Sequence, residues 1–72
     1  MDRKLSTYEA NDGRGYCEVH FNFREEYAYI KYYDDTGKPF YTEDHQNKKI
    51  EDVNTHARKW AEGYEKIEKD LH

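Results

Sequence analysis

Paired carboxylates are the first side chains in this sequence whose types and spacing suggest chemistry. Asp34-Asp35 and Glu43-Asp44 are adjacent acidic pairs, and two carboxylates in a cleft are a common apparatus for general acid–base catalysis. Both pairs fall in segments with turn-like composition, in a chain too small to enclose a water-excluding pocket. Gly13-Arg14-Gly15 lacks the spacing and the following helix of a phosphate-binding loop. We therefore expect no catalytic residues, no cofactor and no enzymatic activity.

Histidine and cysteine are the other candidates, because their side chains bind metal ions. The four histidines are His20, His45, His56 and His72. None has a spacing that presents two ligands together on one element. Cys17 and His20 are three residues apart in a predicted strand, so their side chains point to opposite faces, and His56 falls on the polar side of the predicted helix. The sequence therefore predicts no metal site.

The composition bounds the class of protein. A chain of 72 residues has room for one domain, residues 1–72, with a core of marginal size. The single cysteine excludes an intramolecular disulfide and favours a reducing compartment. No stretch approaches the roughly 20 apolar residues of a membrane span, and no signal-like block follows Met1. We expect a cytoplasmic protein with no membrane contact.

Charge and aromatic content carry two further inferences. Charged residues make up 39% of the chain, a share close to that of disordered chains, but the twelve aromatic residues fall in alternating or helical registers, which indicates a folded domain. The net charge is −4, and residues 1–47 hold six basic and ten acidic side chains. This acidic balance disfavours binding to a phosphate backbone through the overall field.

Alternating residues predict an antiparallel meander of strands. The clearest strand runs from Arg14 to Phe23, and a second runs from Tyr27 to Tyr33. The turn 34–38 leads to a short third strand over 39–42, where Pro39 is tolerable at a strand start. Residues 4–10 alternate more weakly and are the candidate for a fourth strand. Residues 43–47 are expected to be a polar connector.

One long amphipathic helix is predicted over about residues 48–71. Its apolar stripe follows the three- and four-residue steps of a helix face and consists of Ile50, Val53, Ala57, Trp60, Ala61, Tyr64, Ile67 and Leu71. Asn47 is the predicted N-cap. Gly63 interrupts the pattern, so the helix either bends or frays there or lets another surface approach closely. The sequence thus predicts an α+β fold, with three or four antiparallel strands covered on one face by the C-terminal helix.

The alternation also sorts residues into an inner and an outer side of the sheet. The predicted core is Cys17, Val19, Phe21, Phe23, Ala28, Ile30, Tyr32, Phe40, Ile50, Val53, Ala57, Trp60 and Ala61. The other side gathers tyrosines, which offer rigid contact area and are enriched at interfaces, although tyrosine is also simply a good strand former. The predicted partner-binding residues are Tyr16, Tyr27, Tyr29, Lys31, Tyr33, Tyr41, Tyr64, Ile67 and Leu71.

The last three of these belong to the end of the predicted helix, which is longer than the strands beneath it. They either contact a partner or a second copy of the chain, or they pack on Leu5 and Tyr8. For the tyrosine face, the alternatives are a protein partner, stacking of single-stranded nucleic acid supported by Arg14, Arg24 and Lys31, or no ligand at all. We expect a protein-interaction module and keep the nucleic-acid binder as the alternative.

The helix sequence resembles a known group of proteins. Ile50-Glu51-Asp52-Val53, then Ala57, then Trp60-Ala61-Glu62-Gly63 is similar to the closing helix of small uncharacterised β-meander-plus-helix proteins of tailed phages of marine bacteria. The resemblance covers mainly residues 16–63 and includes a strand of the Cys17-Glu18-Val19 kind. It implies a sheet-plus-helix fold, a phage origin and action in the host-cell cytoplasm, and it implies no chemistry.

Overall fold

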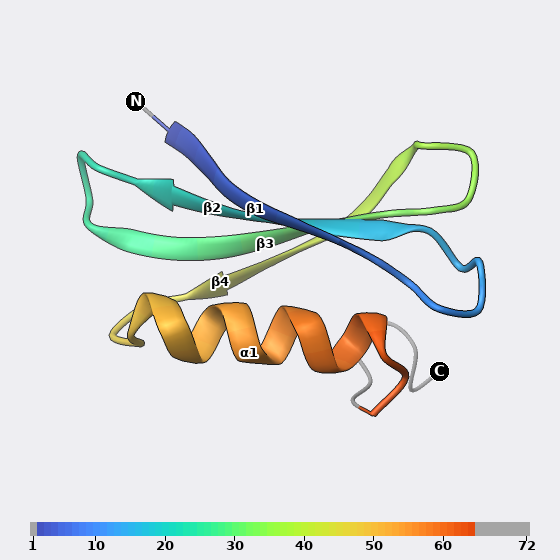
Figure 1. Cartoon of the computed structure of the whole chain (residues 1–72). Coiled ribbons are helices and arrows are strands. Elements are labelled where there is room, and N and C mark those ends of the chain that lie inside the picture. Colours follow the sequence, from blue (N-terminus) through green and yellow to red (C-terminus); the bar gives the residue numbers. More distant parts are fainter. Residues whose placement is uncertain (1, 65–72) are drawn as a thin grey trace.

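The strands form one antiparallel sheet in which each strand pairs with its neighbours in the chain. The computed structural model describes residues 2–64. Its elements are β1 (Asp2–Glu9), β2 (Tyr16–Asn22), β3 (Tyr27–Tyr33), β4 (Pro39–His45) and α1 (Ile50–Ala61), and the sheet order is β1-β2-β3-β4. The helix lies along one face of the sheet (Figure 1). The predicted α+β meander with a single helix is thus confirmed, and the candidate strand over residues 4–10 is a strand.

The strand boundaries differ from the predicted ones at both ends of the sheet. β1 begins at Asp2, and β4 continues to His45, beyond the predicted end at residue 42. Glu43 pairs with Ile30 and His45 pairs with Ala28, so the first three residues of the expected polar connector, 43–45, are part of the ladder. Backbone pairing with a buried strand outweighs the low strand propensity of this acidic stretch.

The core lies between α1 and the two central strands. Trp60 is its largest buried side chain and meets Tyr32 edge to face, with ring centroids 4.9 Å apart. Nine buried residues form this core, and all belong to the predicted set: Cys17, Val19, Ala28, Ile30, Tyr32, Val53, Ala57, Trp60 and Ala61.

Four predicted core residues lie nearer the surface. Phe21 and Phe40 are partly buried and pack against the core. Phe23 is 54% exposed, because it lies just beyond the end of β2. Its ring packs edge to face on Phe21. Ile50 is 41% exposed, because it is the first residue of α1 and lies at the end of the helix.

The helix is shorter than predicted at its C-terminal end. Gly63 has a φ of 87°, and the amide of Tyr64 donates to the Lys59 carbonyl while the amide of Gly63 donates to the Trp60 carbonyl. This hydrogen-bond pattern is the Schellman motif, which ends a helix at a glycine in the left-handed region. The predicted continuation through Gly63 is therefore wrong, and Ile67 and Leu71 lie outside the described residues.

The N-terminal end of α1 also differs from the prediction. The N-cap residue is Lys49, which makes no side-chain capping hydrogen bond. Asn47, the predicted N-cap, has a φ of 62° and belongs to the turn before the helix. Asparagine favours both positions because it tolerates left-handed backbone and caps helices. No helix in the described part of the chain is both long and apolar enough to cross a membrane.

The loop between β1 and β2 holds the C-terminal end of α1. The amide of Asn11 donates to the Ala61 carbonyl at 2.9 Å, and the Arg14 guanidinium donates to the Trp60 carbonyl at 2.7 Å. The same guanidinium lies 4.6 Å from the centroid of the Trp60 ring and forms an ion pair with Asp12. Carbonyls that a helix end leaves without intrahelical partners are thus satisfied by the hairpin.

Candidate functional site

The outer face of the sheet, opposite α1, carries ordered aromatic rings. Tyr16 lies opposite Tyr33, and His20 lies opposite Tyr29. Each pair is stacked, with ring centroids 4.6 Å and 5.2 Å apart. Tyr27 continues the row, with its ring 5.9 Å from that of Tyr29. Four of the predicted partner-binding tyrosines therefore share one face, which we call the tyrosine face.

Charged side chains lie among these rings. Lys31, another predicted site residue, pairs with Glu18 across the two central strands. The Tyr33 hydroxyl donates to Glu18 Oε1 at 3.0 Å, and His20 Nε2 lies 3.0 Å from the same oxygen. Lys4 Nζ is 3.7 Å from Glu18 Oε2. The Glu18 carboxylate thus organises the centre of the tyrosine face.

The electrostatic environment favours the neutral form of Tyr29 and Tyr33 and the charged form of Glu18. Burial raises the pKa of Tyr29 and of Tyr33, and the hydrogen bonds to Asp2 and Glu18 raise them further. Burial also opposes ionisation of Glu18, but the hydrogen bonds from His20 and Tyr33 outweigh it and lower the pKa of this carboxyl. Tyr29 is only 6% exposed, although α1 covers the other face. The rings are therefore held in place before any partner binds.

Tyr41 does not belong to the tyrosine face. It pairs with Tyr32, and the two rings lie 5.8 Å apart on the side of the sheet that faces α1. The register shifts between Tyr32 and Tyr33, so that Tyr33 pairs with Pro39 and Phe40 is the extra residue. Phe40 packs against the core as predicted, and the extra residue places Tyr41 on the same side, so the predicted outward position of Tyr41 is wrong.

The residues predicted at the far end of the helix do not join the tyrosine face. Tyr64 is 80% exposed and follows the end of α1, and Ile67 and Leu71 are outside the described residues. The alternative packing on Tyr8 is not seen for Tyr64. Tyr8 faces α1, where its hydroxyl donates to Asn54 Oδ1 at 3.4 Å beside the shorter bond from Ser6.

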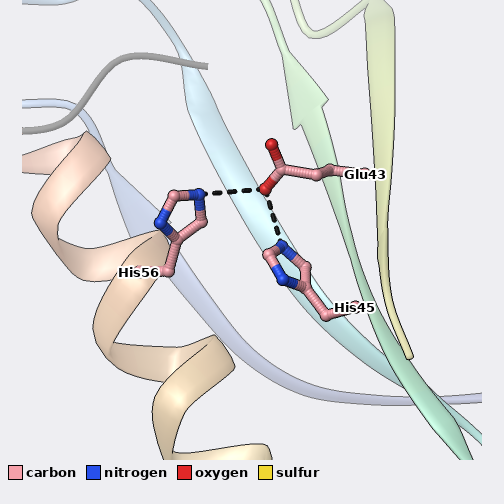
Figure 2. A group of neighbouring side chains, drawn as sticks. All are labelled: Glu43, His45 and His56. Atoms are coloured by element: carbon pink, nitrogen blue, oxygen red, sulfur yellow. Dashed lines mark hydrogen bonds and ion pairs between the residues drawn. The ribbon is translucent and has the colours of Figure 1, made fainter. Parts of the chain in front are cut away.

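A second group of polar side chains lies on the inner side, between β4 and α1. Glu43 Oε1 is 2.6 Å from His45 Nε2 and 3.0 Å from His56 Nε2. Figure 2 shows both rings directing a nitrogen at one carboxylate oxygen. We call Glu43, His45 and His56 the Glu43 cluster. Their side chains are 20%, 15% and 29% exposed, so the cluster is partly buried and open to solvent on one side.

The core reaches the Glu43 cluster through Tyr32. The Tyr32 hydroxyl donates to Glu43 Oε1 at 3.3 Å. Burial raises the pKa of Tyr32, and the negative charge of Glu43 adds to the effect. One carboxylate oxygen therefore accepts the hydrogen bond of the Tyr32 hydroxyl and lies within 3.0 Å of a nitrogen of each of the two imidazoles.

Sequence reasoning missed the Glu43 cluster for identifiable reasons. Glu43 and His45 fall in the stretch predicted to be a connector. A connector has no alternating faces, so the pattern does not predict which side chains lie together there. The two-residue spacing from Tyr41 to Glu43 to His45 is the signal that continues the strand. His56 lies three residues after Val53 and four before Trp60, so it borders the apolar stripe of the helix.

A concave feature of the described residues lies away from the Glu43 cluster, among the loops. A hollow of about 330 Å³ lies between the β1–β2 and β3–β4 loops and is lined by Glu9, Tyr16 and Asp34, among others. The Asp34 carboxylate accepts hydrogen bonds from the Thr36 and Lys38 amides. The hydrogen bond from the Thr36 hydroxyl, followed by those from the two amides, lowers the pKa of Asp34. This pattern of bonds is typical of a turn residue.

Comparisons with protein-family models, curated proteins and solved structures found no match. The resemblance of the helix to phage proteins therefore stays a prediction.

Proposed function

We propose that this protein is a non-enzymatic interaction module that binds another protein through its tyrosine face. The observation that supports the proposal most is that α1 covers only one face of the sheet. The helix packs on the inner face (Figure 1), and no element of residues 2–64 lies over the outer face, where four tyrosines are ordered. Prearranged aromatic side chains supply contact area with little further loss of entropy on binding.

The charges on this face favour a basic partner surface. Cross-strand pairing places four acidic and two basic side chains on the tyrosine face: Asp2, Glu9, Glu18 and Asp44, with Lys4 and Lys31. The excess of two acidic groups attracts a positive patch. Arginine suits such a surface best, because guanidinium groups both pair with carboxylates and stack on tyrosine rings.

The alternative, a single-stranded nucleic-acid binder, receives less support. The carboxylates among the rings repel a phosphate backbone. Tyr16 and Tyr33 stack on each other, so one face of each ring is already occupied and cannot stack on a base. Arg14, which the alternative requires, is engaged with Asp12 and the end of α1.

The proposal is tested by NMR titration of the full-length chain with a peptide of alternating arginine and glycine. We expect amide shifts along β2 and β3 and binding that weakens as salt rises. Tyr27→Ala should weaken binding, whereas Tyr64→Ala, at an exposed site outside the face, should not. Tyr29 and Tyr33 are unsuitable for truncation because their hydroxyls bond to Asp2 and Glu18.

Two further measurements distinguish the competing occupants. Tighter binding of an oligothymidine than of the peptide would replace the proposal by the nucleic-acid alternative. The molar mass in solution is measured in parallel, because a homodimer that Tyr27→Ala dissociates would mean that a second copy covers the face. Equal peptide binding by wild type and Tyr27→Ala would overturn the proposal. In the cell, the proposal places the protein in the cytoplasm, that of the host if the phage resemblance holds.

A further inference from the structure

We propose that the Glu43 cluster is a binding site for a divalent transition metal ion of the zinc type. The proposal rests on the convergence of Glu43, His45 and His56 from two elements and goes beyond the partner-binding role of the tyrosine face. One ligand atom from each side chain lies within 4.8 Å of the other two. Glu43 and His45 are fixed by the β4 ladder, and His56 is fixed by α1.

The donor set matches the chemistry of such an ion. Two imidazole nitrogens and one carboxylate oxygen are the protein ligands of many zinc sites that keep a fourth position open to water. Magnesium and calcium require ligand sets made almost wholly of oxygen, so two imidazoles select against them. The negative charge of Glu43 compensates part of the charge of the ion, and the side open to solvent supplies the entry path.

The distances require only small side-chain movements. Zinc bonds of about 2.0–2.2 Å in a tetrahedron place neighbouring ligand atoms about 3.4 Å apart. Glu43 Oε1 now lies 2.6 Å and 3.0 Å from the two histidine nitrogens, which are hydrogen-bond separations. Each of these two gaps must widen by less than about 1 Å, and the distance between the two histidine nitrogens, at most 4.8 Å, must close by no more than about 1.4 Å. Binding requires that the coordinating nitrogen of each histidine carry no proton.

The Tyr32 hydroxyl is placed to support the bound state. It lies 3.3 Å from the Glu43 carboxylate and belongs to the buried core. A group that hydrogen-bonds to a metal-ligating side chain fixes the orientation of that side chain and raises its affinity for the metal. Because α1 packs mainly on β1, β2 and β3, a metal ion at this position would add a link between the helix and β4.

The chain contains a natural control for this geometry. Glu18 and His20 on β2 have the same two-residue spacing as Glu43 and His45, and Glu18 Oε1 lies 3.0 Å from His20 Nε2. Their other neighbours are the Tyr33 hydroxyl and the Lys4 ammonium group. An ammonium group cannot coordinate a cation and repels it. The pair on β2 should therefore bind no metal, although it has the same two residue types at the same spacing as Glu43 and His45.

The test is calorimetric titration of the metal-free full-length protein with zinc chloride. We expect one ion per chain, with a dissociation constant on the order of micromolar or tighter. Loss of a residue that only hydrogen-bonds to a metal ligand weakens binding by roughly 10–100-fold. His56→Ala and Glu43→Gln change ligands themselves and should each weaken binding by more than this. His20→Ala and His72→Ala should leave the affinity unchanged. Cobalt chloride gives a second readout, because four-coordinate cobalt absorbs visible light.

A measurement on the wild type keeps the proposal falsifiable if a variant fails to fold. In histidine NMR spectra, zinc should shift the ring signals of His45 and His56 and leave those of His20 in place. Absence of binding by the folded wild type would overturn the site, as would shifts confined to His20 or His72. Unchanged affinity in folded His56→Ala would also overturn it. Failure of the tyrosine-face experiments would not affect this result, since the two sites share no residue.

Discussion

At the scale of single residues, Cys17 shows how fully α1 covers the centre of the sheet. Its side chain is buried, and Sγ lies 3.7 Å from the Ala57 carbonyl oxygen. Burial raises the pKa of this thiol to about 12. The thiolate, which is the reactive form, is therefore scarce at neutral pH.

We predict that Cys17 reacts slowly with a thiol reagent in the native protein and rapidly in denaturant. The reason is that both exposure of the sulfur and ionisation of the thiol require α1 to leave the sheet. Absorbance-monitored labelling at pH 8 with and without guanidinium measures the two rates. Equally fast labelling in both conditions would mean that the helix does not protect this position.

Glu18, at the centre of the tyrosine face, makes the stability of the protein depend on pH. Its folded-state pKa lies below the ordinary value of 4.5, so the unfolded chain binds a proton at this carboxyl more readily than the folded chain does. Its contribution to stability is therefore complete above the ordinary value and is lost as the pH falls through the folded value.

Comparison of wild type with Glu18→Gln tests this linkage. We expect the difference in the free energy of unfolding to be about 1 kcal/mol near neutral pH and to shrink as the pH falls from 5 towards 3. Urea denaturation at several pH values gives the measurement. A difference that stays constant with pH would show that the glutamate charge is not involved.

At the scale of elements, the end of α1 depends on a single glycine. Gly63 has a φ of 87°, and an added Cβ would meet no atom within 4 Å. Any cost of a side chain there is therefore conformational and does not come from a clash.

We predict that Gly63→Ala lowers the free energy of unfolding by about 1–2 kcal/mol. Gly63→Asn should cost less, because asparagine tolerates the left-handed region. Urea denaturation of the three proteins is the measurement. Equal stability of the alanine variant and wild type would contradict the role of the Schellman motif.

The elements also show which features could be predicted from sequence. Alternation predicts the buried sides of β2 and β3 correctly because both edges of each strand are paired with neighbouring strands. It misplaces Tyr41 because the bulge at Phe40 depends on pairing with β3. It misses Glu43 and His45 because the strand is expected to end at residue 42. The apolar stripe continues with Tyr64 and so predicts a helix past Gly63, whereas α1 ends at Ala61. Local pattern gives the elements, whereas register, bulges and helix ends are set by tertiary pairing.

At the scale of the whole molecule, stability depends on a core of few side chains. Trp60 is its largest member and joins α1 to Tyr32 and to Arg14. A domain of this size has a free energy of unfolding of only about 4–11 kcal/mol.

We predict that Trp60→Ala, at a cost of about 3–5 kcal/mol, leaves much of the protein unfolded at 37 °C. Trp60→Phe should remain folded, because the smaller ring still fills most of the site. Circular dichroism and the dispersion of amide NMR signals distinguish these states. A well-dispersed spectrum of the alanine variant would place the main source of stability elsewhere.

The hydrogen bonds from the β1–β2 loop to the end of α1 have a consequence for synthesis on the ribosome. Residue 11 leaves the exit tunnel long before residue 61, yet the Asn11 amide and the Ala61 carbonyl must meet. The meander can assemble from neighbouring strands as each one emerges. Until the last helical turn is released, however, the apolar side of the meander remains exposed to water. During this interval the nascent chain is most accessible to chaperones and most prone to aggregation.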